Sequence, residues 1–143
     1  MLNYADETPL HLAAREGKIL MVEYYISNLA DRVHLDGTMI DGWSAFMYAA
    51  INGYILTVDI LHKAKVNIDR QDKFGRTALH WAARYANKPM AKKLCDIGCD
   101  KDIRELEGFT ASELAKHYQH YEVATIITQT RPLKPIMKGA RRL

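Results

Sequence analysis

The sequence has little of what defines several protein classes. Two cysteines are too few for the disulfide framework of a small secreted domain, and four prolines with eight glycines exclude collagen-like or low-complexity chains. The longest apolar run, 45–51, is far shorter than the roughly 18 residues that cross a membrane. The first ten residues contain neither the basic start nor the apolar stretch of a signal peptide. We therefore expect a folded protein of a reducing compartment, the cytoplasm, with the nucleus as an alternative.

Excess positive charge is confined to the C-terminus. The net charge is +3, but residues 131–143 contain five basic residues and no acidic one, so the other 130 residues carry −2. A nucleic-acid-binding domain is normally strongly basic. Binding to nucleic acid or to an anionic membrane is therefore unlikely for the body, and only the tail could support it. Such binding would depend steeply on salt and would vanish when the tail is deleted.

One segment recurs along the chain, starting at residues 8, 44, 77 and 110, that is, at spacings of 36, 33 and 33 residues. Its copies are TPLHLAA, SAFMYAA, TALHWAA and the weaker TASELAK. A period of this length is typical of a stack of similar units that bury their apolar faces against one another. We predict one repeat domain over 1–130 and a basic tail over 131–143. The predicted repeats cover about 3–38, 39–71, 72–104 and 105–130.

Each unit is expected to form two short helices. The first begins at a side-chain oxygen that can accept a hydrogen bond from a backbone N–H two or three residues later; the residues concerned are Thr8, Ser44, Thr77 and Thr110. Gly17 and Gly53, nine residues on, permit the left-handed turn that ends this helix. Turn-rich stretches with Gly75 and Gly108 then link successive units. Helices of two or three turns are unstable alone, so neighbouring units must cover them.

The period and the segments TPLHLAA and TALHWAA resemble the ankyrin repeat family, over about nine-tenths of the chain. The resemblance implies an all-α fold, an ankyrin repeat solenoid of helix-turn-helix units joined by β-hairpin-like loops. It also implies that His11 and His80, at the motif histidine, bridge neighbouring repeat loops and do not catalyse a reaction. Four residues depart from the motif: Met47 and Glu113 replace its histidine, and Ala86 and Gln119 replace its inter-helix glycine.

The sequence contains no pattern typical of an enzyme active site or a nucleotide-binding loop, so we expect neither a reaction nor a cofactor. A zinc site is the sharpest alternative, because Cys95 and Cys99 precede His117 and His120. Seventeen residues separate the two pairs and two separate the histidines, which does not match the spacing of zinc fingers. We therefore expect buried free thiols and no metal.

The resemblance also implies a concave groove, lined by loop tips and first helices, that binds another protein or a peptide. Register places twenty residues there, and six of them are aromatic, against 9% of the whole chain. Aromatic and arginine side chains dominate binding energy at protein interfaces. The candidates are Tyr4, Arg15, Trp43, Ile51, Asn52, Phe74, Arg76, Arg84, Tyr85, Phe109, His117 and Tyr118.

Two interpretations of this surface remain open. Arg76 and Arg84 could pair with carboxylates of a ligand, whereas Trp43 and Phe109 could pack along the row of loops without meeting a ligand. At the level of the whole protein, we expect a monomeric protein-binding module. The alternative is the regulatory or targeting segment of a larger enzyme or channel.

Overall fold

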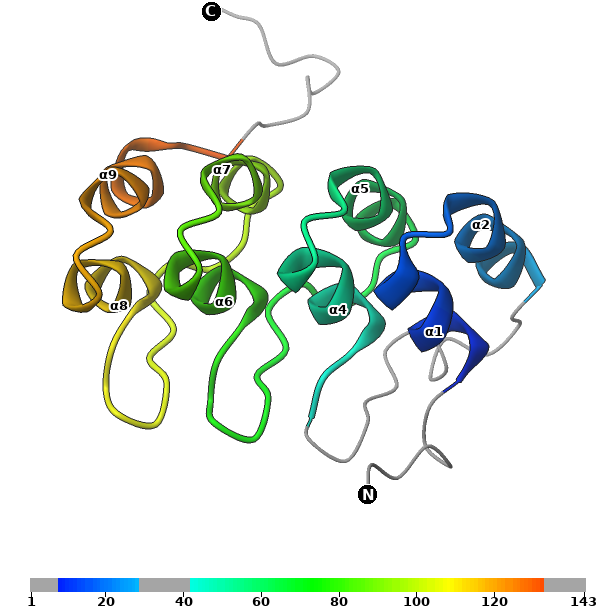
Figure 1. Cartoon of the computed structure of the whole chain (residues 1–143), viewed down its shortest axis with the longest axis horizontal. Helices are drawn as coiled ribbons and strands as arrows, with labels where there is room; N and C mark the ends of the chain where they lie inside the picture. Colours follow the sequence, from blue (N-terminus) through cyan, green and yellow to red (C-terminus); the bar gives the residue numbers. More distant parts are fainter. Residues whose placement is uncertain (1–7, 29–41, 133–143) are drawn as a thin grey trace, which may run out of the picture.

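The computed structural model describes residues 8–28 and 42–132, and within them it contains eight α-helices. Figure 1 shows these helices as four pairs placed side by side, with all first helices in one row and all second helices in another. The first helices are α1 (Pro9–Glu16), α4 (Ala45–Ile51), α6 (Ala78–Arg84) and α8 (Ala111–His117). The second helices are α2 (Ile19–Asn28), α5 (Ile55–Lys63), α7 (Lys88–Asp96) and α9 (Tyr121–Gln129).

The first helices all begin as predicted. Each Ser or Thr accepts a hydrogen bond from the backbone N–H three residues later, for example Thr8 from His11 at 3.2 Å and Ser44 from Met47 at 3.3 Å. Glu113 takes the place of the motif histidine by accepting from the backbone N–H of Thr110 at 3.0 Å, and this hydrogen bond lowers the pKa of its carboxyl. A carboxylate therefore completes the cap as well as an imidazole does.

The inter-helix turns keep a left-handed residue in every repeat. Gly17 and Gly53 have φ values of 71° and 81°, and in the other two repeats Ala86 and Gln119 adopt φ values of 57° and 65°. A side chain makes this conformation unfavourable, by about 1 to 2 kcal/mol. The repeat geometry therefore imposes the turn even where the sequence has lost the glycine.

Burial confirms that stacking supplies the core. Helices α1 and α4, α4 and α6, and α6 and α8 pack against one another, as do second helices of adjacent repeats. The largest buried side chains come from all four repeats and include Leu10, Phe46, Leu79, Met90, Leu114 and Ile127. The all-α solenoid is thus confirmed, whereas the loop of the first repeat and the basic tail beyond Pro132 lie outside the described residues.

Candidate functional site: an aromatic row across the first helices and loops

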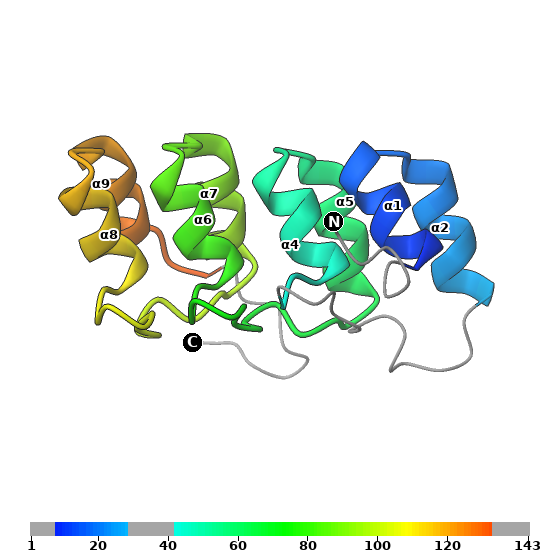
Figure 2. The same cartoon turned by 60° about the horizontal axis from the view of Figure 1, so that its bottom comes forward.

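The two described inter-repeat loops project from the same end of the helix pairs (Figure 2). In the loop before α6, the backbone N–H of Asp72 donates to the carbonyl of Arg76 at 2.9 Å. The loop before α8 repeats this bond between Glu105 and Phe109 at 3.0 Å, and the N–H of Leu106 donates to the carbonyl of Phe74 in the preceding loop. The loops are therefore hairpin-like and are joined to each other.

The Asp72 carboxylate lies at the centre of this end of the molecule and is 6% exposed. One oxygen, Oδ1, accepts from the backbone N–H groups of Phe74 and Arg76 at 2.9 and 3.0 Å. The other, Oδ2, accepts from the indole N–H groups of Trp43 at 2.9 Å and Trp81 at 2.8 Å. One side chain thus fixes its own loop and two tryptophans from different repeats, and we call this arrangement the Asp72 junction.

Aromatic rings extend from the Asp72 junction in both directions. Trp43 makes edge-to-face contacts with Tyr48 and Trp81, with ring centroids 5.2 and 5.3 Å apart. Trp81 stacks on Tyr85, one helical turn later, at 5.9 Å. Such pairs add stability beyond the area that they bury. The tyrosine at the end of this series, Tyr85, is 57% exposed, so the series reaches the surface.

The series continues into the fourth repeat through Arg84. Its guanidinium carbon lies 5.5 Å from the ring centroid of Tyr85 and 4.1 Å from that of Tyr118. Tyr118 contacts His117, which in turn contacts Phe109, with ring centroids 5.1 and 5.0 Å apart. We call the whole set the aromatic row; it comprises Tyr48, Trp43, Trp81, Tyr85, Tyr118, His117 and Phe109.

The two predicted carboxylate-binding arginines differ in their surroundings. Arg76 lies over the Trp81 ring, and its guanidinium pairs with Glu105 and, more distantly, with Glu107. Its side chain is only 14% exposed. Arg84, in contrast, has no carboxylate partner among residues 8–28 and 42–132. Of the two, Arg84 is the one whose charge remains available to a ligand.

The remaining predicted groove residues divide between structural contacts and exposed positions. Asn52 donates to the carbonyl of Arg15 at 2.9 Å and so joins the ends of α4 and α1. Arg15 itself lies over the Tyr48 ring, 5.9 Å from its centroid. Phe74 is exposed at a loop tip, and Ile51 is half-buried at the end of α4. Tyr4 lies outside the described residues.

Three residues of this site were not among the sequence candidates. Tyr48 and Trp81 lie four residues after the Ser or Thr, and Trp81 is therefore one helical turn before Tyr85. Residues four apart share a helix face, so helical spacing could have identified them. Asp72 stands five residues before Thr77, where the following repeat has Glu105. Its two indole contacts depend on tryptophans from separate repeats, which spacing alone does not bring together.

His80 has the structural role that the resemblance implied. Its Nδ1 accepts from the backbone N–H of Thr77 at 3.1 Å, so Nε2 carries the proton and donates to the carbonyl of Phe109 at 2.9 Å. Burial lowers the pKa of the imidazole and keeps it neutral. His80 thus joins the third repeat to the loop of the fourth.

The zinc alternative gains no support from the geometry. No group of three or more histidine, cysteine or acidic side chains suited to a metal ion occurs in the part of the chain that the structure describes. Cys95 and Cys99 are both buried, and burial raises the pKa of each thiol. Zinc binds the deprotonated form, which such surroundings disfavour.

Comparison with known proteins gives the family. A family model for ankyrin repeats in three copies matches residues 2–72 and 46–133. The chain is 36% identical over 75 residues to the ankyrin repeat and SAM domain-containing protein 6 of Mus musculus, covering 52% of this chain and 8% of that protein. It is 32% identical over 108 residues to the neurogenic locus notch homolog protein 1 of Xenopus laevis, covering 76% of this chain and 4% of that protein.

A further relative is the palmitoyltransferase AKR1 of Candida glabrata, which is 30% identical over 93 residues and covers 64% of this chain. The chain spans only 12% of that protein, so each of these relatives is far longer than the matched part. None of the helices within the described ranges has the length and apolar character of a membrane span. With the family model covering most of its length, the chain belongs to the ankyrin repeat family.

Proposed function

We propose that the chain is a protein-binding module that holds a protein or peptide ligand against the aromatic row. Ankyrin repeats generally bind other proteins, and repeat stacks present extended surfaces for this purpose. The observation that carries the proposal is the continuity of the row, in which ring contacts join residues of the second, third and fourth repeats. A surface of this kind is ordered before the ligand arrives, so binding costs little conformational entropy.

The site also indicates which ligand groups it would accept. Both indole N–H groups donate to Asp72, so the two tryptophans offer carbon edges and faces to a ligand. Apolar ligand side chains suit that part of the row. The guanidinium of Arg84 lies beside it and can donate two hydrogen bonds to a carboxylate. The expected ligand therefore combines apolar anchors with at least one acidic side chain, and we expect the protein to act without catalysis, as a cytoplasmic or nuclear monomer.

The alternative, a regulatory or targeting segment of a larger protein, is supported by the relatives. The chain corresponds to between 4% and 12% of the three relatives described above, one of which is named a palmitoyltransferase. An open reading frame that extends beyond either end of this sequence would favour the alternative. The aromatic row would serve for recognition in either case.

The decisive experiment compares three forms of the protein in affinity capture from source lysate with mass spectrometry. They are the wild type, the double variant Arg84→Ala and Tyr85→Ala, and a matched control in which exposed Lys92 and Tyr121 of the second helices become alanine. We expect the groove variant to keep its helicity but to weaken binding of the captured partner by more than about 1 kcal/mol, roughly fivefold. The control should bind like the wild type.

Equal recovery of the partner by the wild type and the groove variant would contradict the proposal. A loss in the control alone would place the binding surface on the second helices.

A further inference from the structure

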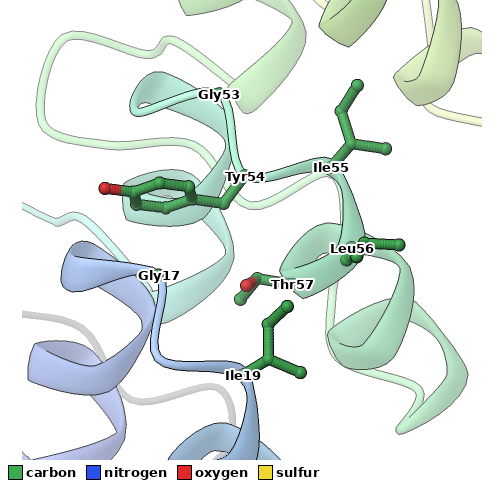
Figure 3. A pocket seen from close by; sticks show the side chains of 7 residues that line it. All are labelled: Gly17, Ile19, Gly53, Tyr54, Ile55, Leu56 and Thr57. Carbon is green, nitrogen blue, oxygen red and sulfur yellow. The ribbon is translucent and has the colours of Figure 1, made fainter.

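A pocket of about 270 Å³ lies between the inter-helix turns of the first and second repeats. It is at the end of the helix pairs opposite the loops, and therefore away from the aromatic row (Figures 2 and 3). We call it the turn-side pocket. It is lined by Gly17, Ile19, Gly53, Tyr54, Ile55, Leu56 and Thr57.

The turn-side pocket has an apolar, uncharged rim. Figure 3 shows the Tyr54 ring reaching across from the second repeat towards Gly17, with Ile19 on the far side. A Cβ atom on Gly17 would come within 2.8 Å of that ring, so the glycine is what allows the close approach. Leu56 is 63% exposed at the rim. Exposed leucine beside an open apolar pocket is typical of an interaction site.

The same place between the third and fourth repeats is built differently. Shifting the register by two repeats replaces Gly53 with Gln119 and Leu56 with Glu122, and Ile19 corresponds to Lys88 of the third repeat. There the Lys88 ammonium and the Glu122 carboxylate pair across the gap. Where the third and fourth repeats have an ion pair, the first and second repeats leave two aliphatic side chains facing a pocket.

Thr57 adds an unsatisfied polar group to this pocket. Its side chain is fully buried, and its hydroxyl oxygen has no hydrogen-bond partner. Figure 3 shows the side chain lying between the Tyr54 ring and Ile19. The other repeats have Met21, Met90 and Val123 at this register position. A buried hydroxyl without a partner is costly, and here it replaces an apolar side chain that would not need one.

The size and chemistry of the pocket select a ligand group. Its volume is below the usual range for drug-sized ligands and suits one large side chain. A charged group would be buried without a counterion, and a phenylalanine or leucine would leave the Thr57 hydroxyl unsatisfied. The amide of glutamine or asparagine brings more donors and acceptors than one hydroxyl can satisfy. A phenol combines an apolar ring with a single hydroxyl at its tip, where it meets the buried oxygen first.

We propose that the turn-side pocket binds a tyrosine side chain of a partner polypeptide, with the ring among Ile19, Tyr54 and Ile55 and the phenol hydroxyl hydrogen-bonded to Thr57. The proposal is independent of the aromatic row, because the two surfaces lie at opposite ends of the helix pairs (Figure 2). It gives the protein a second binding site. A partner could therefore occupy the pocket while the aromatic row is filled or empty.

The test uses p-cresol, which is the tyrosine side chain without its backbone, and toluene, which lacks the hydroxyl. Each is titrated into the full chain and followed by the amide resonances of Gly17, Gly53 and Tyr54 in two-dimensional NMR spectra. Thr57→Val keeps the shape and removes the hydroxyl, and Thr57→Met restores the residue of the first and third repeats. Thr128→Val is the matched control, because the Thr128 hydroxyl donates to the carbonyl of Ala124 on another helix.

We expect p-cresol to bind the wild type and Thr128→Val at least fivefold more tightly than it binds Thr57→Val, whereas toluene should not distinguish these three forms. Thr57→Met should bind neither compound, because methionine fills the pocket. The proposal is overturned if p-cresol shifts none of the three amides in the wild type, or if its affinity is the same for the wild type and Thr57→Val. Unaltered binding of both compounds to Thr57→Met would place them elsewhere.

Discussion

Replacing Asp72 with asparagine would test how the aromatic row is held together. The carboxylate accepts four hydrogen bonds, two at each oxygen. Asparagine retains one oxygen and turns an NH₂ group towards the other pair, so two buried N–H donors lose their acceptor and face a third donor. At about 1 to 3 kcal/mol for each unsatisfied buried donor, we expect the free energy of unfolding to fall by about 2 to 4 kcal/mol.

The free energy of unfolding is measured by urea titration followed by far-ultraviolet circular dichroism. Near-ultraviolet circular dichroism reports on Trp43 and Trp81 separately from stability, and we expect their signal to shrink in Asp72→Asn. Exposed Asp102 provides the control, since Asp102→Asn makes the same chemical change outside the junction. A loss below about 1 kcal/mol with an unchanged tryptophan signal would refute the role that we assign to the Asp72 junction.

Two further predictions concern His80 and the left-handed turns. Because burial lowers the pKa of His80, the unfolded chain binds a proton more readily than the folded chain; stability should be complete above pH about 6.5 and decrease as the pH falls below it. Urea titrations at pH 7.5 and 5.5 should show a smaller pH effect in His80→Gln than in the wild type, and equal pH effects would exclude His80 as the cause. Gln119→Gly should raise the free energy of unfolding by about 0.5 to 1 kcal/mol, because relief of the left-handed strain exceeds the entropy that glycine adds to the unfolded chain. A lower urea midpoint in that variant would contradict this account.

The sequence was sufficient to predict the fold because each repeat states its own structure locally. Thr77 caps α6 and Gly17 ends α1, and both effects depend on residues within a few positions. The 33-residue spacing then determines which faces meet. Even the departures obeyed the repeat, since Ala86 adopts the left-handed conformation that the glycine at this position would have adopted.

The details of the site depend on contacts between repeats, which local patterns do not specify. Register placed Trp43 and Arg76 in the groove, but it could not show that the Trp43 indole points to Asp72 or that Glu105 already holds the Arg76 guanidinium. Likewise, Thr57 is an ordinary helical residue in the sequence. Its significance depends on the pocket that two neighbouring turns create around it.

Packing between adjacent repeats has a consequence for how such a protein can change over evolutionary time. A duplicated or deleted unit creates a new junction of the same kind, so the chain can lengthen or shorten without redesign of a shared interior. The boundary between the second and third repeats is an exception. There Trp43 depends on an acid in the following unit, and inserting a copy between them would separate the pair. The order of these two units is therefore constrained, whereas their neighbours are freer to be shuffled.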